Sequence, residues 1–234
     1  MTERIFILTG AGISAESGVA TFRDNGGLWE RHRVEDVATP EAFERDPALV
    51  QRFYNARRAG LDAVEPNPAH TALTRLQRGL EARGGSAVIV TQNVDDLHER
   101  GGARDVIYMH GELRRALCAA CGHRWEAQGD LRVTDSCPAC RTVGAPRPDI
   151  VWFGEMPYHM DRIERELARA SLFVSIGTSG AVYPAAGFVQ GARALGIPTL
   201  ELNLEPSEGS SLFDETRLGP AGLLVPDWVG ELVG

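Results

Sequence analysis

Short apolar runs alternate with stretches of helical spacing along most of the chain. Five runs, with a sixth near the end, cover residues 4–9, 86–91, 106–109, 172–176, 198–202 and 223–225. They are apolar at consecutive positions, as parallel strands buried on both faces are. Helical patterns separate most of them, at residues 68–82, 160–170 and 184–195. The alternation predicts an α/β fold with an open parallel sheet.

Two stretches interrupt this rhythm and predict a second, smaller lobe. Residues 24–68 show no strand pattern and are expected to form a loop followed by helices, whereas residues 113–148 carry all four cysteines. We therefore expect a Rossmann-like large lobe from residues 1–30, 69–112 and 149–234. The helical insert at 24–68 and a cysteine module at 113–148 would form the smaller lobe.

The residues that follow the first five runs have a common character. Each run ends in glycine or in small polar, acidic or histidine residues, namely Gly10-Ala11-Gly12, Gln92-Asn93-Val94-Asp95, His110-Gly111, Gly177-Thr178-Ser179 and Asn203-Leu204-Glu205. In open parallel sheets, ligands bind beyond the carboxyl ends of the strands. We expect these strand tips to converge on one crevice.

The first strand tip fits the pattern Gly-x-Gly-x-x-Gly/Ala over residues 10–15. In that pattern the first glycine allows a tight turn, the second lets the backbone approach a pyrophosphate, and the helix N-terminus offers N–H groups to the anion. A tight turn without a ligand is the simpler alternative. The usual acidic partner is not clearly placed, because Glu35 and Asp36 lie in the strandless insert; Asn203 and Glu205 are candidates for the ribose hydroxyls instead.

The four cysteines form two pairs, each with two intervening residues, and fifteen residues separate the pairs: Cys118, Cys121, Cys137 and Cys140. This spacing is typical of a zinc ribbon, and four thiolates with no open position indicate a structural Zn²⁺. The alternative is two disulfides or a redox pair. We expect an intracellular chain, where disulfides are rare, which favours zinc.

Composition narrows the class of function. The chain has 234 residues and a net charge of -8, and all 24 basic residues are arginine. Without lysine it can build neither a Gly-Lys-Ser/Thr phosphate loop nor a Schiff base. The acidic balance argues against nucleic acid as a partner, although arginines near the cysteines (Arg114, Arg115, Arg124, Arg132 and Arg141) keep a zinc-ribbon binding module open. No apolar run reaches membrane-span or signal-peptide length, so we expect a cytoplasmic protein without a membrane partner. We also expect a monomer.

His110 is the remaining candidate for chemistry. A lone histidine is most simply a partly buried, hydrogen-bonded side chain. At a strand tip in a nucleotide crevice, however, it is a candidate general base, because the pKa of histidine lies near neutral pH.

Taken in order, these residues resemble the sirtuins, the NAD-dependent protein lysine deacylases, from Gly10 to about Ala221. The resemblance rests on Gly10 to Gly18, Thr21-Phe22-Arg23, Gln92 to Asp95, His110-Gly111, the four cysteines, Phe153-Gly154-Glu155, Gly177-Thr178-Ser179 and Asn203-Leu204-Glu205. One departure is Ala20, where many members carry proline. That position contributes loop stiffness, so the departure leaves the resemblance intact.

The resemblance implies a reaction. The carbonyl oxygen of an acyl-lysine attacks C1′ of the nicotinamide ribose of NAD, nicotinamide leaves, and an alkylimidate forms. His110 then acts as general base on a ribose hydroxyl, which attacks the imidate carbon. Water completes the release of lysine and O-acyl-ADP-ribose. NAD is consumed as a co-substrate, and the expected partners are proteins or peptides that contain acylated lysine.

The resemblance also implies residue roles. Asn93 and Asp95 join His110 as catalytic residues. The expected NAD contacts are Gly10, Ala11, Gly12, Ser14, Ala15, Glu16, Phe22, Arg23, Trp29, Gln92, Asn93, Asp95, Gly177, Thr178, Ser179, Asn203, Leu204, Glu205 and Ala221. The substrate peptide would pair as an added strand with the segment that contains Val151, Phe153, Gly154 and Glu155.

Tyr54 and Arg57 suggest the class of acyl group. They lie three residues apart in a helical pattern and therefore share a face. A guanidinium forks onto a carboxylate and a phenol adds a hydrogen bond, although a solvated arginine beside a core tyrosine is the simpler interpretation of the spacing. The pair resembles the Tyr-x-x-Arg signature of class III sirtuins, in which a small residue such as Ala15 widens the acyl pocket. This resemblance implies removal of succinyl and malonyl groups alongside acetyl.

Three rival functions share some of these features. A protein ADP-ribosyltransferase would also cleave nicotinamide from NAD, but would leave ADP-ribose on a protein. A zinc-ribbon binding module with a vestigial nucleotide fold would not turn over NAD. An ordinary NAD dehydrogenase would need a hydride acceptor site, which nothing in the chain suggests.

Overall fold

The large lobe is built on one parallel sheet. The computed structural model describes residues 3–19, 28–29 and 32–234. Its six-stranded sheet has the order β11–β10–β9–β1–β4–β5, with every neighbouring pair parallel. The strands are β1 (Arg4–Thr9), β4 (Ser86–Thr91), β5 (Ile107–Tyr108), β9 (Leu172–Ile176), β10 (Thr199–Asn203) and β11 (Glu215–Leu218). The predicted open parallel sheet is confirmed.

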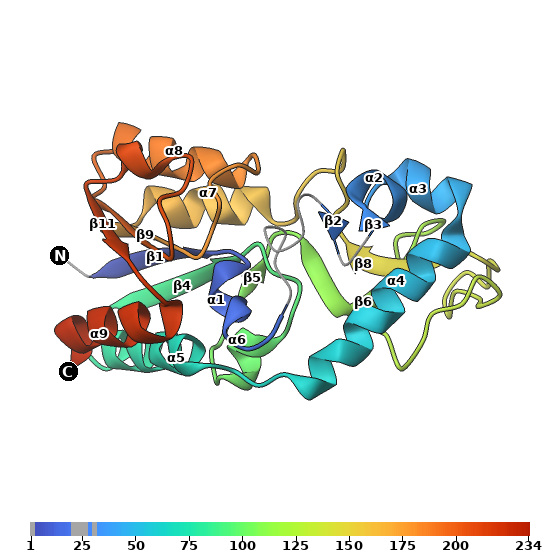
Figure 1. Ribbon diagram of the computed structural model, residues 1–234, viewed down its shortest axis with the longest axis horizontal. Coiled ribbons are helices and arrows are strands. Elements are labelled where there is room, and N and C mark those ends of the chain that lie inside the picture. Colours follow the sequence, from blue (N-terminus) through green and yellow to red (C-terminus); the bar gives the residue numbers. More distant parts are fainter. Residues whose placement is uncertain (1–2, 20–27, 30–31) are drawn as a thin grey trace.

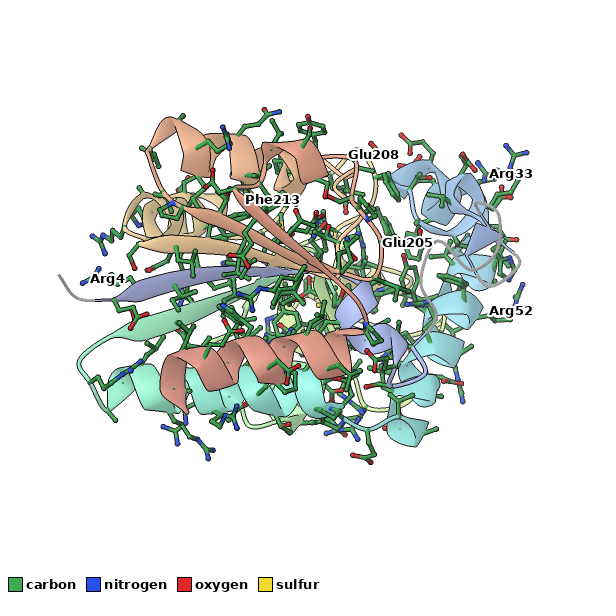
Figure 2. The ribbon with its side chains drawn as sticks, turned by 60° about the vertical axis from the view of Figure 1, so that its left-hand side comes forward. Arg4, Arg33, Arg52, Glu205, Glu208 and Phe213 are labelled. Carbon is green, nitrogen blue, oxygen red and sulfur yellow. The ribbon has the colours of Figure 1, made fainter. Side chains whose placement is uncertain are left out.

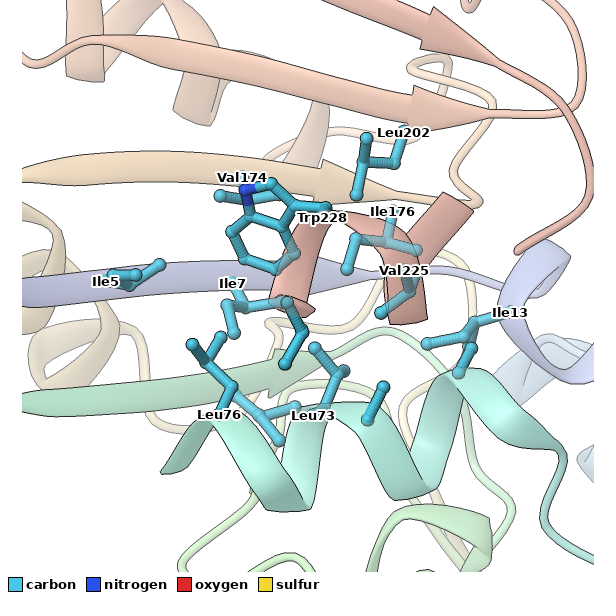
Figure 3. Close-up of a cluster of buried hydrophobic side chains, with 14 of the residues drawn as sticks. Ile5, Ile7, Ile13, Leu73, Leu76, Val174, Ile176, Leu202, Val225 and Trp228 are labelled. Carbon is cyan, nitrogen blue, oxygen red and sulfur yellow. The ribbon is translucent and has the colours of Figure 1, made fainter. Parts of the chain in front are cut away.

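Helices cover both faces of this sheet, which explains why its strands are apolar at consecutive positions (Figure 1). Ile5 and Ile7 of β1 belong to the core beneath α5 (Pro68–Glu81) and α9 (Ala221–Val233), where Leu73, Leu76 and Trp228 meet them (Figure 3). Phe6 and Leu8 point to the opposite core, beneath α7 (Met160–Ala168) and α8 (Phe188–Ala194). Successive residues of one strand therefore serve two cores.

The strand predicted at residues 223–225 is wrong. Residues 223–225 are not a strand but part of α9, in which Val225, Trp228 and Val229 recur at helical spacing against the sheet. The true last strand, β11, is mostly exposed and polar at the sheet edge, so its sequence gave no apolar signal. The helix expected at 184–195 begins with a 3₁₀ turn, η2 (Ala185–Gly187), before α8.

The smaller lobe combines helices with a second sheet. Its helical part contains α2 (Val34–Val37), α3 (Pro40–Arg45), α4 (Pro47–Gly60) and the 3₁₀ turn η1 (Leu61–Ala63). An antiparallel sheet, β7–β6–β8, holds the cysteine module, with β6 (Gly111–Cys118), β7 (Arg124–Glu126) and β8 (Pro146–Ile150). This sheet reaches two residues beyond the expected limits of 113 and 148.

The insert at 24–68 also differs from its prediction. It was expected to lack strands, but β2 (Leu28–Trp29) and β3 (His32–Arg33) form a two-residue antiparallel pair. Strands this short carry too few residues for a periodic pattern to appear. The remaining short elements are α1 (Gly12–Ala15), α6 (Leu97–Arg100) and η3 (Ser210–Leu212).

Helix α4 is fastened to the cysteine module by polar side chains on one face. Gln51 Nε2 donates to the Pro146 carbonyl at 2.8 Å. Asn55 donates through Nδ2 to the Leu131 carbonyl at 2.9 Å and accepts the Leu131 N–H at 3.0 Å. Arg58 Nε donates to the Leu113 carbonyl at 2.7 Å.

Across the described part of the chain, none of the helices has the length and apolar character that crossing a bilayer requires.

Candidate active site

The strand tips converge, as the sequence predicted. Gln92 Nε2, after β4, donates to Thr178 Oγ1, after β9, at 3.0 Å. Asn203 Nδ2, at the end of β10, donates to the Thr178 carbonyl at 2.8 Å. The Gly12 N–H, after β1, donates to the Gly177 carbonyl at 2.7 Å. Direct hydrogen bonds thus join the carboxyl ends of four strands into one surface.

The glycines of this surface are required by packing between two turns. A Cβ on Gly12 would lie 2.7 Å from Gly177 Cα, and one on Gly10 would lie 2.8 Å from the Gly177 carbonyl oxygen. Gly177 itself has φ +62, in the left-handed region. Contact between the β1 and β9 turns therefore also requires glycine at position 12, and approach to a pyrophosphate stays a prediction. Helix α1 has only four residues, and the N–H groups of Gly12, Ile13 and Ser14 all bond within the protein.

Asn93 and Asp95 are buried and held in place. Asn93 Nδ2 donates to Ser14 Oγ at 3.0 Å, and its N–H donates to Thr91 Oγ1 at 3.0 Å. Asp95 accepts the Leu97 N–H at 3.2 Å. Burial raises the pKa of the Asp95 carboxyl, and the hydrogen bonds from Leu97 and Ser14 act in the opposite direction. The two side chains are therefore fixed by local contacts before any substrate binds.

A buried polar network beneath Asn93 was not predicted. Thr9 Oγ1 lies 2.9 Å from Thr91 Oγ1 and 3.0 Å from His98 Nε2, and His70 Nε2 lies 3.5 Å from Ser14 Oγ. Burial lowers the pKa of His70 to about 4 and that of His98 to about 3, so both imidazoles are neutral at pH 7. A signal existed in the sequence, since His70 falls among the apolar positions of the 68–82 helix.

His110 has a defined tautomer. Its Nδ1 lies 3.1 Å from the Gln92 carbonyl oxygen, which can only accept, so Nδ1 carries the proton. Nε2 is therefore the nitrogen with a free lone pair. Burial lowers the pKa of His110, and the bond to Gln92 raises it by less. The ring is a neutral base at neutral pH, as a general-base role requires.

Several residues predicted to bind NAD have other partners or lie at the rim. The Glu16 carboxylate accepts the Gly222 N–H at 2.8 Å, beside Ala221, and so ties α1 to the start of α9. The Ser179 carbonyl accepts the Glu208 N–H at 3.0 Å. Leu204 is 65% exposed, and Glu205 lies at the end of the sheet nearest the helical lobe (Figure 2).

Three further predicted NAD contacts lie at the start of helix α1, within it, or in the short hairpin of β2 and β3. Ala11 is half-buried at the start of α1 and Ala15 is exposed. The backbone of Trp29 pairs with His32 in the short hairpin. Ala20, Phe22 and Arg23 lie outside the described residues.

A cavity of about 140 Å³ adjoins Asp95. Its lining in the described part of the chain comes from three regions: Gly18 and Val19; Ala56, Arg57, Gly60, Leu61 and Val64; and Val94, Asp95 and Leu113. Arg57 thus brings a cation to an otherwise mostly apolar wall, with its Cζ 5.7 Å from the centroid of the Phe53 ring. Ala15 does not line this cavity, so its expected part in widening an acyl pocket is not seen.

Tyr54 is not among the residues that line this cavity. It is fully buried, and its phenol oxygen accepts a hydrogen bond of 3.0 Å from Trp152 Nε1. Burial raises the pKa of Tyr54, and the charge of Arg57 lowers it by less. The simple alternative for the pair was a solvated arginine beside a core tyrosine. Its first half is wrong, because Arg57 is only 9% exposed, whereas Tyr54 is indeed part of a buried cluster.

The stretch predicted to receive the peptide is already hydrogen-bonded. The N–H groups of Val151, Phe153 and Glu155 donate to the carbonyls of His110, Ala38 and Trp152, respectively, at 2.9 to 3.0 Å. The Glu155 carboxylate binds both terminal nitrogens of Arg147, at 2.7 and 2.9 Å. Gly154 is exposed with φ +89, and Phe153 is 48% exposed. The N–H groups of these three residues are therefore not available to an added strand.

The four cysteines fit a tetrahedral metal. Their sulfur atoms all lie within 4.8 Å of one another, with 3.6 Å between Cys118 and Cys140 and 3.8 Å between Cys121 and Cys137. Zn–S bonds of about 2.3 Å place tetrahedral ligands about 3.8 Å apart. All four thiols are free, so the disulfide alternative is wrong. The donor set is that of a structural Zn²⁺ site.

Comparisons with known proteins agree with this geometry. The model of the Sir2 family matches residues 10–184. The chain is 56% identical to an NAD-dependent protein deacylase of Caulobacter vibrioides, over 98% of this chain and 97% of that one. It is 55% identical to an NAD-dependent protein deacylase of Vibrio cholerae, over 98% and 93%. A solved Sir2 homologue in complex with NAD is 38% identical, has a TM-score of 0.87 and covers 97% of this chain and 88% of that one. A structure of Sir2 bound to acetylated peptide matches at 26% identity and a TM-score of 0.81, over 97% and 92%. The chain therefore belongs to the Sir2 family.

Proposed function

We propose that this protein is an NAD-dependent protein lysine deacylase that prefers acyl groups ending in a carboxylate, succinyl and malonyl, and also removes acetyl. The deacylase activity is supported by relatives of that name at 53–56% identity over nearly the whole chain. The solved relatives support NAD and an acylated peptide as the two substrates.

The acyl preference rests on one observation: the Arg57 guanidinium lines the cavity beside Asp95. A guanidinium in a largely apolar wall attracts a carboxylate more strongly than one in water, and it can bind both oxygens at once. An acetyl group offers no charge to it. Arg57 would therefore add binding energy only for acyl chains that end in a carboxylate.

The chain's own residues divide the remaining work. His110 Nε2 would accept the proton of a ribose hydroxyl while Nδ1–H keeps the ring oriented on the Gln92 carbonyl. Asn93 and Asp95, already fixed by Ser14 and Leu97, would hold the nicotinamide and ribose side. NAD supplies the ribose carbon that receives the acyl oxygen and the nicotinamide that leaves. The cysteines would hold the structural Zn²⁺ away from the reacting atoms.

Nicotinamide release from NAD, with one peptide carrying either acetyl-lysine or succinyl-lysine, tests the proposal. We expect release with both and a higher kcat/KM for succinyl. Arg57→Met should lower kcat/KM for succinyl by at least about tenfold, because a charge-assisted hydrogen bond is lost, and change acetyl little. Arg52→Met, on the exposed side of the same helix (Figure 2), is the matched control and should change neither.

Each alternative outcome has a clear meaning. If Arg57→Met lowered kcat/KM equally for the two peptides, the carboxylate preference would be refuted and the deacylase assignment would stand. Radiolabel from NAD retained on protein would indicate ADP-ribosyl transfer instead. Absence of release with either peptide would overturn the deacylase assignment.

We further propose that the protein acts as a cytoplasmic monomer without a nucleic-acid partner. The net charge of -8 supports the last part, because nucleic-acid binding depends on neutralising phosphates. Analytical ultracentrifugation tests whether the protein is a monomer. A mobility-shift assay tests whether it binds nucleic acid. A dimer or a shifted band would contradict them.

A further inference from the structure

Asp95 is held at its backbone as well as at its side chain. The Tyr108 hydroxyl lies 3.1 Å from the Asp95 carbonyl oxygen, and it also contacts Oε2 of the Glu99 carboxyl group. Tyr108 is 7% exposed and Asp95 is 3% exposed, so water competes little for the first contact. The contact joins two parts of the site, since Tyr108 belongs to β5 and Asp95 lies between β4 and α6.

The edge of the parallel sheet sets the position of Tyr108. Strand β5 pairs with β4 so that Tyr108 stands opposite Thr91, whose Oγ1 accepts the Asn93 N–H at 3.0 Å. The same two strand ends therefore support both Asn93 and Asp95. The Asp95 carboxylate accepts the Leu97 N–H at the start of α6, at 3.2 Å. Tyr108 thus adds an anchor from β5 to the anchor from α6.

The chemistry of the three groups decides where the phenol proton points. A phenol has one proton, and a carbonyl oxygen can only accept. Both contacts of Tyr108 are therefore hydrogen bonds at the same time only when the Glu99 carboxyl is protonated and donates to the phenol oxygen. An ionised Glu99 competes with the Asp95 carbonyl for the phenol proton, because a carboxylate is the stronger acceptor.

The surroundings of Glu99 favour its neutral form. Partial burial raises the pKa of Glu99, the hydrogen bond with the phenol lowers it by less, and the negative charges of Glu112 and Asp96 raise it further. The nearby guanidinium groups of Arg100 and Arg114 pair with Asp96, at 3.8 and 2.6 Å. The geometry and the local charges therefore agree on a carboxyl group that donates to the phenol oxygen.

We propose that Tyr108 is a positioning residue that fixes Asp95 for the nicotinamide half of NAD, and that Glu99 directs the Tyr108 proton to the Asp95 carbonyl. This inference rests on the proposed function, in which Asp95 holds the nicotinamide and ribose side. It extends that function to two residues outside the set predicted to bind NAD. Tyr108 need not touch NAD, because it acts through the backbone of Asp95.

Tyr108→Phe tests the inference, because it removes the hydroxyl and keeps the ring. With the acetyl peptide, we expect the KM for NAD and the inhibition constant of the product nicotinamide to rise about three- to tenfold, the effect of one lost hydrogen bond. The inhibition constant of ADP-ribose, which is NAD without its nicotinamide, should stay unchanged. Tyr158→Phe is the matched control, since its hydroxyl donates to Asp149 at 2.9 Å, and it should change none of these constants.

Glu99→Gln tests the direction of the phenol proton, because an amide N–H can donate to the phenol oxygen at every pH. In the wild-type protein, ionisation of Glu99 at rising pH should increase the ratio of the KM for NAD to the inhibition constant of ADP-ribose. This increase should be smaller in Glu99→Gln. An equal increase in the two proteins would overturn the role of Glu99.

Two other results would overturn the inference as a whole. One is an unchanged KM for NAD in Tyr108→Phe, and the other is an equal rise in the inhibition constant of ADP-ribose, which would indicate a general disturbance of the site. If the wild-type protein released no nicotinamide with an acylated peptide, the proposed function itself would fail, and that result is distinguishable from both.

Discussion

At the scale of single residues, the contact between His110 and the Gln92 carbonyl fixes which imidazole nitrogen can take a proton. It also makes the reaction sensitive to pH in a predictable direction. Burial lowers the pKa of His110, so the neutral form, which the proposed general-base role requires, persists to a lower pH than for an exposed histidine. Protonation of Nε2 at still lower pH removes the base.

We therefore expect kcat/KM to fall on the acid side with a midpoint below the usual pKa range of histidine. A pH profile with the acetyl peptide measures it, since that substrate carries no titrating acyl carboxylate. His110→Tyr serves as the inactive control. An acid limb at or above the ordinary histidine pKa would contradict the expectation.

Residue identities at the site were largely predictable, but their partners were not. Asn93, His110 and Thr178 follow strands, and strand ends in a parallel sheet must meet. Glu16 was expected to face the cofactor, yet it accepts a backbone N–H from α9, more than two hundred residues away in the chain. A contact between such distant segments leaves no local pattern, so it could not be found from the sequence.

At the scale of elements, helix α4 joins the cysteine module to the cavity. Asn55 makes two hydrogen bonds to the backbone of Leu131 in the module, while Arg57 lines the cavity. We expect Asn55→Ala to destabilise the protein by about 1–3 kcal/mol, because two backbone groups lose a partner. It should also raise KM for the succinyl peptide more than for the acetyl peptide, since α4 carries Arg57, the residue proposed to select the acyl group.

Thermal unfolding and paired kinetics measure these effects, with Arg52→Ala as the control on the exposed side of α4. Unchanged Tm in Asn55→Ala would show that the contact does not hold the helix.

The elements themselves were predictable to different degrees. Two-sided strands such as β1 and long amphipathic helices such as α5 were found at nearly their true limits, because burial imposes a period on their sequences. Strand β8, with the sequence Pro-Arg-Pro-Asp-Ile, was missed. It is fully buried although it contains an arginine and an aspartate, since Glu155 and Arg124 neutralise them.

At the scale of the whole molecule, the cysteine site supports a module (residues 113–148) with little core of its own. Its two apolar clusters have only three buried residues each: Ala116, Ala127 and Leu131 in one, and Cys118, Cys137 and Ala145 in the other. Such a segment depends on metal for folding. We expect one equivalent of zinc per chain, measured by metal analysis, and a lower Tm after chelation that excess zinc restores. Cys140→Ser should lower zinc content and Tm together, and an unchanged Tm in metal-free protein would contradict a structural role.

The faces of α4 have one more consequence. Gln51, Asn55 and Arg58 turn toward the cysteine module, while Tyr54 and Arg57 lie on an adjacent face, and successive helical residues are rotated by about 100°. Under the proposed function, substitution of Arg57 would change the accepted acyl group while Gln51, Asn55 and Arg58 keep the helix docked. A single residue inserted or deleted between Asn55 and Arg57, by contrast, would rotate Arg57 by about 100° relative to Gln51 and Asn55. The proposed acyl preference would therefore tolerate a point mutation at position 57 but not a change in the length of this helix, and new specificities should arise by substitution within a helix of fixed length.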